Sequence, residues 1–383
     1  MNWKRSAAIQ RRIAFTDKWL LACLTWLPIA LALCIWAIFR AGIATNLPIG
    51  VVDLSHSSLS QQLTRTIDAS PTLAINASFS DVSAAKQALI QGDVYAYVVI
   101  PTQFDRDTMN GFAPQISAFY NSQYVLVGKL IHSALSQAHA TFNAKLAVAG
   151  KLKSGNATLA SAAGKALPIR SQVTALFNLN SNYAQFLVSA IVPALWQIMI
   201  VVVTIMILAA NQRQRGLRPW LSPSPVKQLI LTLTPYVPVF FAHGAAFITG
   251  FYLWLDWPFH GQIWLVLLAQ FVTIIACMIM GALFYFVTLD SARAMSFAGA
   301  FTAPSFAFMG ITFPVTDMNA MASVWRSLLP VSHYIEVQLG QASYGENWIA
   351  SIEKMAPMLG YLLPAFGIWL LMQRQLRKAE ASQ

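Results

Sequence analysis

The stretch WLLACLTWLPIALALCIWAIF, residues 19–39, contains no charged residue. It is long enough to cross the hydrocarbon core of a bilayer, which takes about 20 apolar residues in a helix. Its apolar core also exceeds the roughly 7–15 residues of a cleaved signal peptide. The stretch therefore predicts an uncleaved transmembrane helix over residues 19–40.

The rest of the sequence also has a membrane composition. Hydrophobic residues make up 57% of the chain and charged residues only 10%, whereas a soluble domain carries roughly a quarter charged residues. A span near 294–313 is interrupted by Pro304 and Gly310. The pattern predicts an α-helical polytopic membrane protein with six transmembrane helices, five of them within residues 183–373. These five lie at about 183–210, 228–255, 262–289, 294–313 and 355–372.

The distribution of Lys and Arg predicts how the chain is oriented. The N-terminal arm (1–18) and the C-terminal tail (374–383) are basic, whereas the connection at 256–261 has neither Lys nor Arg. Short cytoplasmic connections are the ones enriched in these residues. We therefore expect a bacterial inner-membrane protein with both termini and residues 211–226 in the cytoplasm. Residues 41–182 are then extracytoplasmic.

The positive charge itself suggests lipid rather than nucleic acid as a partner. The net charge is +11, but the basic residues flank apolar runs and form no continuous stripe, which argues against nucleic-acid binding. In the arm, Trp3, Ile9 and Phe15 intersperse with cations. This pattern is typical of an amphipathic helix on anionic lipid; a short basic tail that only sets topology is the alternative.

Residues 41–182 show alternating strand and helix patterns. We predict strands at 47–54, 94–101 and 114–121, helices at 57–70 and 82–93, and a helical region at 123–182 broken near 151–156 and at Pro168. Strands that alternate with helices indicate a small inserted α/β domain. Asp53, Asp81 and Asp93 lie at element ends and are interpreted as caps. His132 and His139 share a helix face without a carboxylate and are interpreted as surface or packing residues.

The sequence lacks the usual motifs of catalysis. It contains no G-x-x-x-x-G-K-[ST], G-x-S-x-G or H-E-x-x-H, and its three cysteines lie in apolar runs without metal-site spacing. We expect no catalytic, metal or cofactor site in this chain, so any ATP is bound by a partner. The spans hold almost no ionisable residues, which disfavours an ion-coupled transporter.

Three segments together resemble a known family. The first comprises IGVVDLSHSSLSQQL (49–63) and VSAAKQALIQGDVYAYVVIPTQFDRDTMNG (82–111). The second is GITFPVTDM (310–318) followed by LLPVSHY (328–334), and the third is ANQRQRGLRPWLSPSPVKQ (210–228). Their order resembles the ABC-2 type transporter permeases, in the subgroup with a large extracytoplasmic domain between the first and second transmembrane helices. The resemblance implies a fold like that of type V ABC exporters.

The resemblance also implies two functional elements. Residues 211–226 would form a coupling loop that docks on an ATPase, with Arg213, Arg215, Gly216, Arg218, Leu221 and Pro225 at the matching positions. The acidic positions of the family are here Gln212, Gln214 and Pro219, so the ATPase groove should be neutral or acidic; the arginines could also serve topology alone. A re-entrant element within 314–350 would involve Gly310, Phe313, Pro314, Pro330 and His333.

The expected function is that of an export permease subunit. It would move an amphiphilic or hydrophobic cargo of the drug or lipid class, driven by cytoplasmic ABC ATPase subunits. A second permease subunit, like or unlike, would complete the pathway, and a periplasmic adaptor can join the assembly. The alternatives are a membrane-anchored sensor or assembly protein that acts through residues 41–182, and a secondary transporter.

Overall fold

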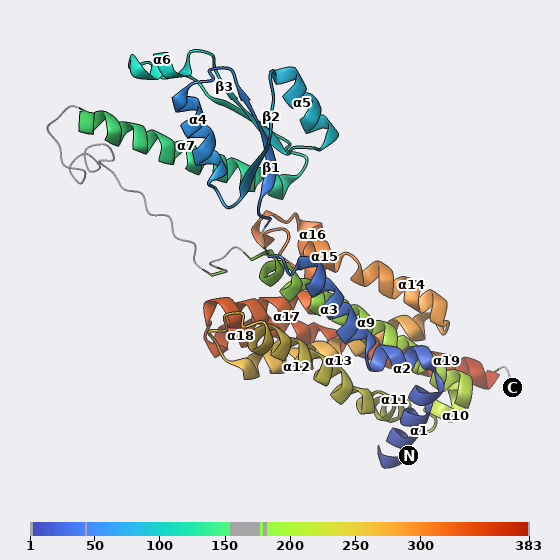
Figure 1. Ribbon diagram of the computed structural model, residues 1–383. Helices are drawn as coiled ribbons and strands as arrows, with labels where there is room; N and C mark the ends of the chain where they lie inside the picture. Colours follow the sequence, from blue (N-terminus) through green and yellow to red (C-terminus); the bar gives the residue numbers. More distant parts are fainter. Residues whose placement is uncertain (1–2, 43, 154–176, 179–181, 382–383) are drawn as a thin grey trace. The chain divides into compact units, whose positions relative to one another are not determined.

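The computed structural model describes residues 3–42, 44–153, 177–178 and 182–381. The chain divides into two compact units (Figure 1). One is helical and consists of Met1–Gly42 with Ala175–Gln383, and the other is an α/β unit, Ile43–Thr174. The α/β unit is contiguous in sequence, whereas the helical unit is built from two segments.

A four-stranded sheet forms the centre of the α/β unit, in the order β2-β1-β3-β4. β1 (Leu47–Asp53) is parallel to β2 (Leu73–Ser78) and to β3 (Ala96–Ile100), and β4 (Ser117–Tyr120) is antiparallel to β3. Opposite residues include the pairs Leu47 with Leu73, Ile49 with Ala96, and Tyr97 with Phe119. The helices are α4 (Ser58–Asp68), α5 (Val82–Gln91), α6 (Phe104–Met109) and α7 (Val125–Lys153).

Side chains of β1 enter two separate cores. Ile49 and Val51 are buried with residues of α4 and α7, and Val52 is buried with Ala85 of α5. Successive strand residues point to opposite faces of a sheet, so one apolar strand can serve both. Figure 1 shows α4 and α7 on one face of the sheet and α5 on the other.

The predicted elements of this unit are present, with two additions. The predicted strands form β1, β3 and β4, and the predicted helices form α4, α5 and the start of the long helical region, α7. α5 ends at Gly92, whose φ of +85° suits glycine. β2 and the short α6 were not predicted. The predicted break at Pro168 lies outside the described residues.

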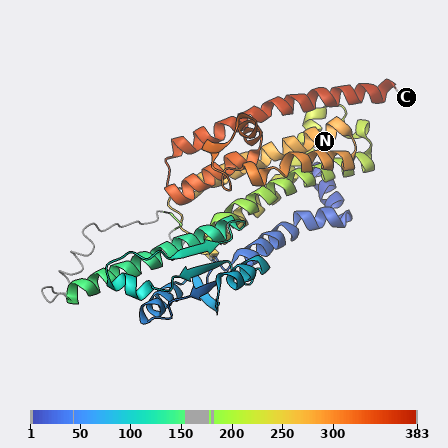
Figure 2. The same cartoon turned by 90° about the horizontal axis from the view of Figure 1, so that it is seen from above.

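Among its described residues, the helical unit contains four helical segments that are long and apolar enough to cross a membrane. A fifth candidate is a bent pair, α2 (Lys18–Leu24) and α3 (Leu27–Phe39), with an angle of 55° between the two helices. The four are α9 (Tyr183–Arg215), α11 to η2 (Pro225–Trp254), α13 (Ile263–Thr288) and α18 to α19 (Trp348–Lys378). Seen from above, α2 and α3 lie on the opposite side of the unit from α19 (Leu362–Ala381), with α9 and α13 between them (Figure 2).

Two predicted spans differ from the structure. The first is broken after Leu24, and Pro28 lies in the first turn of α3. A continuous helix is disfavoured there because proline has no N–H and its ring would clash with the carbonyl group of Leu24, four residues earlier. The predicted span at 294–313 is not one continuous helix. It consists of α14 (Ser291–Thr302) and α15 (Ser305–Phe308). Pro304 lies between them, and it has no N–H with which to continue the hydrogen bonds of α14.

α9 runs through the core of the helical unit. It packs on α13, where Gly281 lies so close that a Cβ atom there would come within 2.8 Å of the Val201 carbonyl oxygen. Its Gln197 side chain is fully buried, donates to Ser305 Oγ and accepts from the Val331 N–H, both at 2.9 Å. Small residues and buried amides are the usual means by which membrane helices associate. Gln197 thereby joins α9 to α15 and α17 (Pro330–Leu339).

Candidate functional site

The basic turn, defined as residues 211–226, contains the end of α9, a glycine and a short helix. α9 ends at Arg215, and Gly216 follows with φ +73° and ψ 153°. This backbone conformation is open essentially to glycine alone. The chain then forms α10 (Leu217–Leu221) and enters α11 (Pro225–Leu233). Gly216 thus sets the direction in which the turn leaves the long helix.

The base of the basic turn is fixed to neighbouring helices. Trp220 is fully buried, donates from Nε1 to Thr232 Oγ1 at 2.9 Å and stacks on Phe286. Gln212 accepts from the Tyr285 hydroxyl at 2.6 Å. α10 is therefore hydrogen-bonded to α11 and stacked on α13, and the end of α9 is hydrogen-bonded to α13.

The N-terminal helix α1 (Trp3–Thr16) is bonded to the same place. Gln10 and Asn211 exchange two amide hydrogen bonds of 2.9 Å each, and both side chains are buried. Ser6 Oγ donates to the Leu231 carbonyl at 2.6 Å, and the Tyr236 hydroxyl donates to the Gln10 carbonyl at 3.2 Å. α1 is thus attached to α9 and to α11 at the start of the basic turn.

The predicted docking residues fall into two groups. Arg213 and Arg218 are exposed, and Arg213, whose side chain is 67% exposed, lies 3.9 Å from Asp17. Arg215 is half-buried and lies 3.4 Å from Asn211 Oδ1, while Leu221 is fully buried. Leu221 therefore packs the turn against the helices, and Pro225 begins α11. The exposed face of the turn is basic, and the buried face is apolar.

The sequence interpretation missed the partners of the turn. Trp220, Gln10 and Asn211 were not singled out, although each anchors it. One signal was available: Ser6, Gln10 and Ile13 recur at i, i+4 and i+7, and the structure buries all three on one face of α1. Because Ser6 and Gln10 are polar, apolar periodicity alone does not identify this face.

The second predicted element begins at a sharp bend. Gly310 has φ +88°, Phe313 is exposed, and Pro314 leads into a short 3-10 turn. Pro330 occupies the first turn of α17, and His333 is buried with Nε2 3.0 Å from the Ser327 carbonyl oxygen. The segment is a series of short helices, with α16 (Ala320–Ser327) between the bend and α17.

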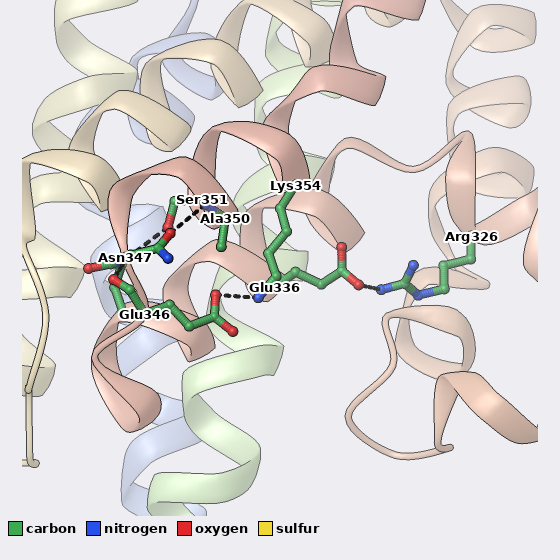
Figure 3. A network of polar contacts seen from close by, with 8 residues as sticks. Arg326, Glu336, Glu346, Asn347, Ala350, Ser351 and Lys354 are labelled. Carbon is green, nitrogen blue, oxygen red and sulfur yellow. Dashed lines mark hydrogen bonds and ion pairs between the residues drawn. The ribbon is translucent and has the colours of Figure 1, made fainter.

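Two ion pairs support this second element (Figure 3). Arg326 Nη2 lies 2.5 Å from Glu336 Oε1, and Lys354 pairs with Glu346. The buried Gln341 donates from Nε2 to Ser351 Oγ and to the Glu346 carbonyl, both at 2.8 Å, beside the second pair. Charged side chains that are partly or mostly removed from water are stable when they are paired. Among the described residues, no cluster of His, Cys, Asp and Glu suited to a metal ion is found.

A family comparison matches both units of the chain. The model of the ABC-2 family transporter protein aligns with residues 18–372, from the start of α2 to the middle of α19. The chain belongs to the ABC-2 transporter family. Neither a curated protein nor a solved structure matches it significantly. This ABC-2 chain is accordingly a membrane component of a transporter and is mostly helical. The basic turn and the second predicted element with its ion pairs, together called the 310–355 region, both fall within the matched residues.

Proposed function

We propose that this ABC-2 chain is the permease subunit of an ABC exporter and that separate ATPase subunits dock on the basic turn. The main support for the proposal is that one face of this turn is exposed and basic, whereas the opposite face is packed against the helices. Its outer face presents Arg213 and Arg218, whereas its inner face is bonded through Trp220 and Gln212 to α11 and α13. A docking element needs both an accessible surface and a stiff connection to the spans.

The same hydrogen bonds suggest how movement of the ATPase subunits is transmitted to the transmembrane helices. ATP binding brings the two ATPase subunits together and displaces the turns that they hold. Trp220 transmits the displacement to Thr232 of α11, and Gln212 transmits it to Tyr285 of α13. The tilt of these helices changes the pathway between this chain and a second permease subunit, which can be a copy of it or a different chain.

The proposed topology has six crossings with both termini in the cytoplasm of a bacterial cell. Five are the candidate spans described above, and the sixth is the broken segment formed by α14 and α15. The α/β unit is then extracytoplasmic, where a periplasmic adaptor can bind it. α1 would lie on the inner leaflet, since Trp3 and Phe15 are exposed beside cations. We propose an amphiphilic or hydrophobic cargo of the drug or lipid class.

ATP hydrolysis tests the docking proposal. The full chain is reconstituted with a candidate ABC ATPase partner, and hydrolysis is compared for the wild type and for Arg213→Glu/Arg218→Glu. An acidic or neutral groove should reject the reversed charge, so stimulation by the permease should fall. The matched control is Arg293→Glu/Arg377→Glu, which reverses two other exposed cations on the proposed cytoplasmic side. Equal hydrolysis in all three proteins would refute docking at this turn.

Labelling of single cysteines tests the topology. Ser222→Cys in the basic turn and Gln61→Cys in α4 are both exposed positions. In a background without the three native cysteines, a membrane-impermeant maleimide should label Gln61→Cys from the outside and Ser222→Cys only in inverted vesicles. Labelling of both from the same side would contradict the six-span arrangement.

A further inference from the structure

We propose that the helical unit contains a binding cavity for a neutral aromatic compound that donates a hydrogen bond. The cavity has a volume of about 360 Å³ and is lined by residues of α9, η2 (Gly250–Trp254), α17 and η4 (Gly340–Tyr344). This is within the size range of small-molecule sites. It is also lined by Gln185 and Phe186, in the first turn of α9.

The walls of the cavity favour an aromatic ligand without charge. Phe186, Tyr252, Trp257 and Tyr344 provide ring surfaces, and Trp257 is held by stacking on Phe251 at 5.2 Å. Rings bind other rings by offset stacking and edge contacts. None of the described lining residues is Asp, Glu, Lys, Arg or His. A charged ligand would therefore lose its hydration without gaining a counter-charge.

A buried acceptor among the polar lining groups gives the cavity its preference for a donor. Gln338 lines the cavity and is only 3% exposed. Its Nε2 donates to the Ser189 carbonyl at 3.0 Å, but its Oε1 has no hydrogen-bond partner among the described residues. The Tyr252 side chain interacts with the same amide and leaves this oxygen unpaired. A buried acceptor without a partner is unfavourable, and a ligand hydroxyl or N–H would satisfy it.

The alternative occupant is water, which would satisfy the same oxygen without any aromatic preference. The two cases differ in what they predict for a matched pair of ligands. 1-Naphthol offers an aromatic surface and a donor, whereas 1-methoxynaphthalene offers the same surface and no donor. The identification of such a ligand as cargo rests on the proposed permease function, but its binding does not.

Binding to the purified full chain in nanodiscs tests the proposal without any ATPase, with empty nanodiscs giving the partition into lipid. The wild type should bind 1-naphthol about tenfold more tightly than its methyl ether, as expected for one added hydrogen bond. Gln338→Leu should abolish this preference. Equal binding of the two compounds by the wild type, or binding of neither, overturns the proposal, as does a preference that survives Gln338→Leu.

A second variant keeps the test valid if Gln338→Leu does not fold. Ser343→Trp places a large ring in the lining of the cavity and should abolish binding of both compounds. Ser296→Trp, at an exposed position of α14, is the matched control and should bind like the wild type. Unchanged binding by Ser343→Trp overturns the proposal. Because hydrolysis is not measured, failure here leaves the docking proposal untouched.

Discussion

Gln10 and Asn211 hold each other by two reciprocal hydrogen bonds although 201 positions separate them in the sequence. Each amide donates to the oxygen of the other, and Asn211 also donates to the Ile207 carbonyl. The pair fixes α1 to the last turns of α9, directly before the basic turn. Any displacement of that turn must therefore carry the N-terminal helix with it or break this contact.

Breaking half of the pair should cost more than removing all of it. Gln10→Leu and Asn211→Leu each leave a buried N–H of the remaining amide without its partner. This costs about 1–3 kcal/mol, whereas two apolar partners can be nearly neutral. We expect both single variants to unfold at a lower temperature than Gln10→Leu/Asn211→Leu in detergent. Gln214→Leu, an exposed amide of the same turn, is the control and should match the wild type. A double variant less stable than both single variants would contradict this account.

Gly216 provides a second test of the turn. Its φ of +73° with ψ 153° is a region that side chains avoid, and a non-glycine residue there costs on the order of 1–3 kcal/mol. Gly216→Ala should therefore lower the thermal midpoint and reduce ATPase stimulation, because α10 would leave α9 in another direction. The control is Gly299→Ala within α14, where an added Cβ meets no atom within 4 Å. We expect that variant to be neutral or slightly stabilised.

The sequence predicted local structure better than long-range contacts. Alternation and length identified β1, β3 and α4, because each buries an apolar face that its own residues reveal. β2 has a mixed pattern, LAINAS, and is held largely by backbone bonds to β1, so it escaped detection. Hydropathy also could not show the break at Pro28, because it sums apolarity over a window and ignores the missing N–H.

The sequence predicted where the candidate site lies in the chain, but not which residues hold it in place. A basic, proline-containing turn between two apolar runs was visible in the sequence, and so were its arginines. What holds that turn was not visible, because Trp220 bonds across a helix boundary to Thr232 and Gln10 bonds to a residue of another helix. Such partners depend on tertiary packing, which no local pattern encodes. The same holds for Gln338, because the lack of a partner for its buried oxygen depends on the packing around it.

Acid should weaken the start of α5 in the α/β unit. The pKa of the Asp81 carboxyl is lowered chiefly by the hydrogen bond from the Ala84 N–H, which this N-cap accepts at 2.9 Å. A carboxyl with a depressed folded-state pKa stabilises the fold above its unfolded-state pKa, and the effect is lost as pH falls through the folded value. Hydrogen exchange should show α5 less protected in Asp81→Ala than in the wild type at neutral pH.

The difference between the two proteins should shrink as the solution is made acidic, because the protonated wild-type carboxyl is then a weaker acceptor. Exchange in α4, whose cap is Ser57, is the internal control and should respond equally in both proteins. A difference in α5 that persists unchanged into strongly acidic solution would show that charge on Asp81 is not the cause.

The two ion pairs of the 310–355 region should differ in how much each loss destabilises the fold. The Arg326 side chain is only 10% exposed and its Nε has no hydrogen-bond partner among the described residues, whereas the Lys354 side chain is 29% exposed. A buried cation left without its counter-charge costs about 3–5 kcal/mol, while a cation that reaches water is rehydrated when its partner is removed.

Glu336→Gln should therefore lower the thermal midpoint of the purified chain more than Glu346→Gln does, although each replaces one carboxylate by an amide of the same shape. Arg326→Met/Glu336→Gln, which removes the stranded cation as well, should recover part of the loss. If Glu346→Gln lowered the thermal midpoint more than Glu336→Gln, the exposure of the cation would not determine how much each ion pair stabilises the fold.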